Sequence, residues 1–113
     1  MVERDTFPFG IERNGGRHNS FEVREQRFRD SFEILQKNPA LEKASDAEFG
    51  LHLLAGRVTI DGIPREEVTA DLILDLCTED YGCLQEAVQR LEARRVAFRG
   101  AAGAAPQAGD SPP

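Results

Sequence analysis

The sequence has few residues that could bind a metal ion or form a disulfide, since its 113 residues include only two cysteines and two histidines. Cys77 and Cys83 are separated by five residues, a spacing typical of neither a zinc ribbon nor a redox motif. On a helix they would lie on different faces, so we expect both thiols to stay reduced and unpaired. His18 and His52 belong to no His-x-x-x-His pair and to no Cys–His cluster. The sequence therefore predicts no metal site and no cofactor.

Motifs for catalysis are also absent. Gly15-Gly16 is not followed by the helix start, lysine and hydroxyl residue of a phosphate-binding loop, and Asp61-Gly62 lacks the run of aspartates of a calcium loop. Carboxylates are plentiful between residues 66 and 80, but they occupy helix starts and polar faces, where solvated acids are expected. A paired acid–base role would need a shared cleft. We therefore expect a protein that is not an enzyme.

Long apolar runs and an excess of positive charge are missing as well. No window approaches the ~18 apolar residues of a membrane span, and Met1–Asp5 lacks the apolar core of a signal peptide. The formal net charge of −6 and the pI near 4.9 disfavour binding to a phosphate backbone, which needs a basic patch. These absences predict a soluble cytoplasmic protein with neither a membrane nor a nucleic acid as its partner.

Alternating apolar and polar residues predict a β-hairpin over residues 6–25. The apolar positions of the alternation are Phe7, Phe9, Ile11, Phe21 and Val23. Asn14-Gly15 between the two segments is a strong hairpin signal, because both residues tolerate positive φ. Pro8 has no N–H to donate, so the first strand is expected at the edge of the sheet.

Three to four short helices are expected to cover the apolar face of the hairpin, which is marginal alone. Asp30 is suited to cap the first, which should end before Pro39. Ser45-Asp46-Ala47-Glu48 forms a capping box for a helix whose apolar stripe reaches Val58. A proline suited to a helix start precedes residues 65–68, and Thr78 is suited to cap the last helix. The expected core comprises Phe7, Phe9, Phe21, Val23, Leu51, Leu54, Leu84, Val88 and Leu91.

The fold class is thus α+β, an N-terminal β-hairpin packed on three to four short helices, with a disordered C-terminal tail. From Gly100 onward the composition is reduced to small and polar residues, which cannot bury enough apolar area to offset the entropy of ordering. The chain divides into a flexible N-terminus (1–5), a single small α+β domain (6–99) and a disordered tail (100–113).

The segment 63–76 has no clear strand or helix pattern but is rich in apolar residues. If it is helical, its leucines and isoleucine cannot all face one core, because consecutive positions turn by ~100°. At least one should be exposed and, with side chains of the preceding helix, should line a groove for a partner helix. The candidate partner-binding residues are Phe49, Leu53, Leu72, Ile73, Leu74 and Leu76. The alternative is that they close a seam of the core or a homodimer interface.

A series of short motifs carries a family resemblance. In chain order these are Phe21-Glu22-Val23-Arg24-Glu25, Arg29-Asp30, Leu51-His52-Leu53-Leu54-Ala55, Gly62-Ile63-Pro64-Arg65-Glu66-Glu67-Val68, and Asp75-Leu76-Cys77-Thr78-Glu79-Asp80-Tyr81 before Leu84-Gln85-Glu86-Ala87. Their order resembles that of the small tail assembly chaperones of tailed phages and prophages with Mu-like tails, over residues 7–92. The chain differs from the family's pattern in longer central steps, at residues 59–61 and 69–72.

The resemblance implies a non-enzymatic helper that binds the tape-measure protein before the tail tube subunits polymerise around it. Its partners would be the tape-measure protein and, in addition, the tail tube subunit, and it would act in the host cytoplasm. A homo-oligomer is compatible with this role. The alternative function is a small acidic regulatory module that binds proteins, such as an antitoxin or the partner of a transcription factor.

Overall fold

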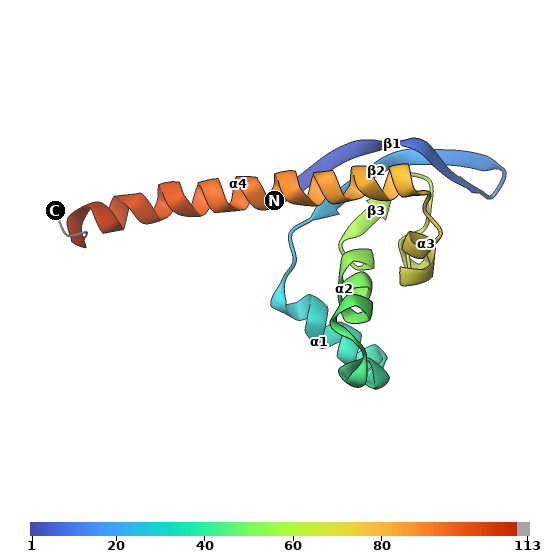
Figure 1. The fold of residues 1–113 in the computed structure, drawn as a ribbon, viewed down its shortest axis with the longest axis horizontal. Coiled ribbons are helices and arrows are strands. Elements are labelled where there is room, and N and C mark those ends of the chain that lie inside the picture. Colours follow the sequence, from blue (N-terminus) through green and yellow to red (C-terminus); the bar gives the residue numbers. More distant parts are fainter. Residues whose placement is uncertain (111–113) are drawn as a thin grey trace.

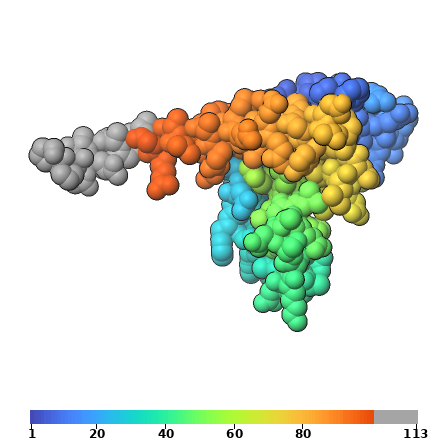
Figure 2. Space-filling model, viewed as in Figure 1, coloured from blue at the N-terminus to red at the C-terminus, as the bar shows by residue number. Residues whose placement is uncertain are grey.

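A three-stranded antiparallel sheet, a long helix beside it and a helical lobe make up the computed structural model in Figure 1. The structure describes the backbone of residues 1–110 and the side chains of residues 1–100. Helix α4 runs along the sheet, whereas α1 and α2 extend away from both (Figures 1 and 2). This is the α+β architecture that the sequence predicts. None of the described helices has both the length and the apolar character needed to cross a bilayer.

The hairpin consists of β1 (Val2–Arg13) and β2 (Gly16–Arg24). Asn14 and Gly15 both have positive φ, at 53° and 78°, as the tight turn between twisted strands requires. Residues 1–5, which are predicted from the sequence to be flexible, instead belong largely to a strand, because β1 begins at Val2, which pairs with Arg24. The terminal ammonium group of Met1 adds an ion pair with Glu25 at 2.8 Å. The N-terminus is therefore part of the sheet.

An irregularity in β1 explains why Phe9 is not in the core, contrary to the sequence-based expectation. The pairing with β2 shifts between Thr6 and Ile11, and Gly10 has a φ of 83°. Phe7 is fully buried and stacks on Phe21 with ring centroids 4.3 Å apart. Within this irregular segment the alternation is interrupted, and Phe9 is 56% exposed.

The third strand, β3 (Val58–Ile60), pairs with the Phe21–Val23 part of β2. Val58 is predicted from the sequence to lie at the end of the helix that begins after Ser45. In the structure that helix ends at Ala55, before Val58. Val58 and Ile60 are buried and Thr59 is exposed, the alternation of a strand with one face on a core. Because the order is β1-β2-β3, β1 is an edge strand, as Pro8 indicates.

The helical elements largely follow the predicted starts and stops. They are α1 (Phe28–Lys37), the 3-10 turns η1 (Pro39–Lys43) and η2 (Arg65–Glu67), α2 (Asp46–Ala55), α3 (Ala70–Leu74) and α4 (Thr78–Asp110). Ser45 caps α2 by accepting a hydrogen bond from the Glu48 N–H. Asp30 is the third residue of α1 and not its cap, and its carboxylate instead accepts from the N–H of Arg27. Thr78 is the first residue of α4 rather than the residue before it.

Helix α4 is attached to the edge of β1 through backbone groups of that strand. The carboxylate of Asp80 accepts from the N–H groups of Phe9 and Gly10, both at 2.9 Å. Further along α4, the Cys83 thiol donates to the carbonyl of Thr6 (3.4 Å), and Arg94 donates to that of Val2 (2.6 Å). Asp80 is only 1% exposed. The prediction that the acids of this segment are solvated is therefore wrong for Asp80.

The C-terminal segment, residues 100–113, is predicted from the sequence to be disordered. The helical backbone of α4 continues to Asp110, in keeping with the high helix propensity of alanine, and residues 111–113 lie outside the described part. The disorder of residues 100–113 stays a prediction, which truncation tests.

Asp80→Ala should lower the free energy of unfolding by about 2–4 kcal/mol, because two N–H groups of the β1 bulge lose their acceptor. Glu79→Ala is the matched control: this neighbour in the same turn is exposed and should cost less than about 1 kcal/mol. Urea denaturation measures both. Equal losses of unfolding free energy in the two variants would contradict this, because they would show that Asp80 stabilises the protein through its charge at the start of α4 and not through its bonds to the bulge.

Deleting residues 101–113 should leave the melting temperature unchanged within experimental error, because among residues 1–100, whose side chains are described, the last hydrogen bond from α4 to β1 is made by Arg94. Thermal melts followed by circular dichroism measure this. A drop of several degrees would mean that the deleted segment docks on the domain.

Candidate protein-binding groove

A groove with a volume of about 940 Å³ lies between α2, α3 and the first turns of α4. It opens beside α2 and below α4 (Figure 2). Its apolar residues are Ala47, Leu51, Leu54, Ile73, Leu74, Leu76, Tyr81 and Val88. Leu54 and Ile73 are buried and form the floor, whereas Leu74 is 65% exposed. The groove therefore combines a closed apolar floor with an apolar side chain that projects into solvent.

The sequence-predicted partner-binding residues divide between the groove and other places. Ile73, Leu74 and Leu76 line the groove, and the exposure of Leu74 agrees with the expectation that one residue of this segment faces solvent. Leu72 is buried in the core on the other side of α3. Phe49 and Leu53 are half-buried but do not line the groove. On α2 the lining runs along one face of the helix, at positions 47, 51 and 54, and the side chains of Phe49 and Leu53 lie on other faces.

Four residues of the groove are not among the predicted partner-binding residues. Leu54 is in the core, as predicted, and Leu51 and Val88, also predicted as core, are partly buried against it. Tyr81 has no predicted role. Their stripes on α2 and α4 are those of an ordinary amphipathic helix. The groove forms where these two stripes and α3 come together, and this arrangement of three helices has no signal in the sequence.

Polar residues surround the apolar surface. The amide of Gln85 donates a hydrogen bond to the hydroxyl of Tyr81, which holds the tyrosine ring at the mouth of the groove. Asp46 and Glu48 stand at the start of α2, and Arg57 follows its end. Burial, and then the positive charge of Arg24, lower the pKa of Arg57 from its usual value. The rim thus carries acids at one end of α2 and a partly desolvated arginine at the other.

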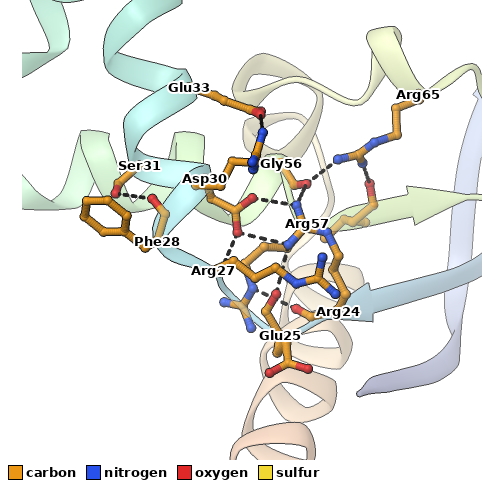
Figure 3. Close-up of polar contacts among 12 residues, drawn as sticks. Arg24, Glu25, Arg27, Phe28, Asp30, Ser31, Glu33, Gly56, Arg57 and Arg65 are labelled. Atoms are coloured by element: carbon orange, nitrogen blue, oxygen red, sulfur yellow. Dashed lines mark hydrogen bonds and ion pairs between the residues drawn. The ribbon is translucent and has the colours of Figure 1, made fainter.

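Arginines fix the end of α2 to the sheet and to α1 (Figure 3). Arg24 of β2 donates to both carboxylate oxygens of Asp30, at 2.7 and 2.9 Å, and also to the carbonyl of Gly56 at 3.1 Å. Arg57 donates in turn to the carbonyl of Arg24 at 2.8 Å. Arg65 donates to the carbonyls of Val58 and Gly56. These bonds set the position of the α2 wall of the groove.

The Arg24–Asp30 pair also shifts the protonation of both groups. Hydrogen bonds from Arg24 hold the pKa of Asp30 below its ordinary value, although burial opposes the shift. The same bonds raise the pKa of Arg24. Because Asp30 is buried and Arg24 is only partly exposed, both charges depend on each other for solvation.

The residues considered for catalysis or metal binding lie apart from one another. No group of three or more histidines, cysteines or acids in the described part of the chain could hold a metal. His18 lies in the hairpin, with its Nε2 3.1 Å from the carbonyl of Arg13, while His52 is on α2. Both cysteines are free thiols, as expected. Burial is the main cause that raises the pKa of Cys83 above its ordinary value.

Comparison of the chain with protein-family models, with curated proteins and with solved structures gives no match.

Asp30→Asn should lower the free energy of unfolding by about 2 kcal/mol at neutral pH, since a charged, partly buried hydrogen-bonded pair is lost. The folded-state pKa of Asp30 is lowered, so its stabilisation is present above the unfolded-state pKa of about 3.9 and is lost as pH falls through the folded-state value. The difference in stability between wild type and variant should therefore begin to shrink as pH falls below about 4 and should vanish only below the folded-state pKa of Asp30. Chemical denaturation at several pH values measures the difference.

Asp61→Asn is the control, because this exposed carboxylate has no ion pair among the described residues. Its effect should stay within about 0.5 kcal/mol at every pH. A gap between wild type and Asp30→Asn that is unchanged at low pH would contradict the role assigned to the pair.

Proposed function

We propose that the protein is a non-enzymatic chaperone that holds an amphipathic helix of a larger protein in the groove. The observation that carries this proposal is the exposure of Leu74 and Tyr81 at the mouth of an apolar concave surface. An exposed apolar surface rimmed by polar residues is typical of protein-binding sites. Helix-in-groove recognition uses apolar side chains spaced by three and four residues, which suit an elongated hollow between helices.

The client that fits best is the tape-measure protein of a tailed phage or prophage, which the resemblance of the sequence motifs implies. A long helical protein presents many apolar stripes before its tail tube subunits cover them, and it needs a partner that keeps those stripes from aggregating. A net charge of −6 suits this role, because it keeps a chaperone and its client dispersed in the host cytoplasm. The tail tube subunit is a second candidate partner.

Leu74→Asp tests the groove directly. Leu74 is 65% exposed, so the variant should fold, while its carboxylate would have to be desolvated beneath a bound apolar helix. We expect at least a tenfold loss of affinity, or about 1.4 kcal/mol, for fragments of the tape-measure protein of the same genome. Isothermal titration calorimetry measures the affinity, and circular dichroism checks the fold.

Phe98→Asp is the matched control, because Phe98 is 66% exposed on α4 and lies outside the groove. It should bind the fragments as the wild type does. Binding that survives Leu74→Asp would place the client elsewhere. Capture of a short regulatory protein, with no affinity for any tape-measure fragment, would favour the regulatory module instead.

A further inference from the structure

Helix α1 buries a charged residue and exposes its aromatic ones. Asp30 is its one buried residue, whereas Phe28 is 88% exposed and Phe32 is 45% exposed. An amphipathic helix of a monomer normally turns its apolar stripe toward the core. Here Arg24 binds Asp30 and the apolar residues Ile34 and Leu35 are half-buried, whereas the two phenylalanines remain on the outside. The aromatic face is therefore free to contact another molecule.

The aromatic face is held in a fixed orientation. Besides its bonds to Arg24, the Asp30 carboxylate accepts the N–H of Arg27 at 2.7 Å, and Ser31 donates to the carbonyl of Phe28 at 2.9 Å. Figure 3 shows the ring of Phe28 pointing away from this network. The face is also accessible, since α1 belongs to the lobe that projects from the rest of the molecule (Figures 1 and 2).

Two parallel rows of side chains make up this face. Phe28 and Phe32 form one row, and Arg29 and Glu33 form the other, each with the four-residue spacing that aligns side chains along a helix. With Gln36 they border a shallow hollow of about 440 Å³. Arg29 and Glu33 lie 3.8 Å apart, with side chains that are mostly exposed, so their charges are available to a partner.

We propose that α1 is the interface of a homodimer, in which the α1 helices of two copies pack antiparallel about a two-fold axis. Such an axis is perpendicular to the helices and lies between them. It places each row of one copy opposite the same row of the second copy, with the two rows running in opposite directions. Phe28 then faces Phe32 of the second copy, and Arg29 faces its Glu33. Aromatic side chains then contact aromatic side chains, and each charged side chain faces one of opposite charge, so the surface is complementary to itself.

A second copy fits this face better than an unrelated helix does. An isologous interface requires a patch that matches itself under a two-fold rotation, and two-fold dimers are the commonest oligomers. The two rows meet that requirement in side-chain type and in charge. The α1 face shares no residue with the groove lined by α2, α3 and α4, so dimerisation would leave both grooves open. The inference does not depend on what the grooves bind.

Sedimentation equilibrium of the full chain tests the proposal. We expect a monomer–dimer equilibrium with a Kd of about 10–100 µM, as suits an interface smaller than the standard size. Phe28→Ser should raise the Kd at least tenfold without changing the circular dichroism spectrum, since the ring makes little contact within the monomer. Phe98→Ser, with a similarly exposed ring on α4, should leave the Kd unchanged.

Charge reversal tests the antiparallel pairing. Arg29→Glu and Glu33→Arg should each weaken the dimer, because like charges then face each other across the axis. The double variant Arg29→Glu/Glu33→Arg should restore it, and so should an equimolar mixture of the two single variants. Glu66→Arg changes the charge by the same amount at an exposed residue outside this face and should have no effect.

Three results would overturn the proposal. The first is a chain that stays monomeric at concentrations of about 1 mM, well above the expected Kd. The second is a dimer whose Kd is insensitive to Phe28→Ser. The third is a dimer that the double charge reversal does not restore after the single reversals weaken it.

Discussion

The carboxylate of Asp80 against the bulge of β1 is the interaction on which the arrangement of the other elements depends. A strand that bulges leaves N–H groups without partners, and here Phe9 and Gly10 turn theirs to the first turn of α4. This contact fixes the start of α4 at one end of the sheet. From there the helix carries Leu84, Ala87 and Leu91 over the core and presents Tyr81 and Val88 to α2 and α3. The groove exists because α4 is held in this place.

Local signals in the sequence predict most of the elements but not the contacts between them. Asn14-Gly15 predicts the hairpin turn, Pro39 the end of α1, and Ser45 with Glu48 the start of α2, because each signal acts within a few residues. The bulge is different, since it depends on an acid about seventy residues further along the chain. Strand β3 is only three residues long, too short for alternation to be distinguished from the end of a helical stripe.

Part of the groove lining can be predicted from the sequence for the same reason. Helical geometry requires that one of the apolar residues 72–76 face solvent, and Leu74 does. Phe49 and Leu53 lie outside the lining, because the groove is bordered by the stripe of α2 that contains Ala47, Leu51 and Leu54, and which stripe of a helix meets its neighbour depends on contacts between elements distant in the sequence. Likewise, nothing in the sequence distinguishes an exposed Phe28 from a buried one until Asp30 is seen to occupy the inner face of α1.

The covering of β1 by α4 limits the kinds of protein with which the sheet can associate. An uncovered edge strand invites extended peptides, and the edges of other copies, to add further strands, which is a common route to aggregation. Here side chains of α4 occupy backbone groups of Val2, Thr6, Phe9 and Gly10 along that edge. On the opposite edge Arg65 occupies the carbonyl of Val58. These side-chain bonds leave fewer free backbone groups on the two outer strands, so there is less opportunity for a further β-strand to pair with either edge of the sheet.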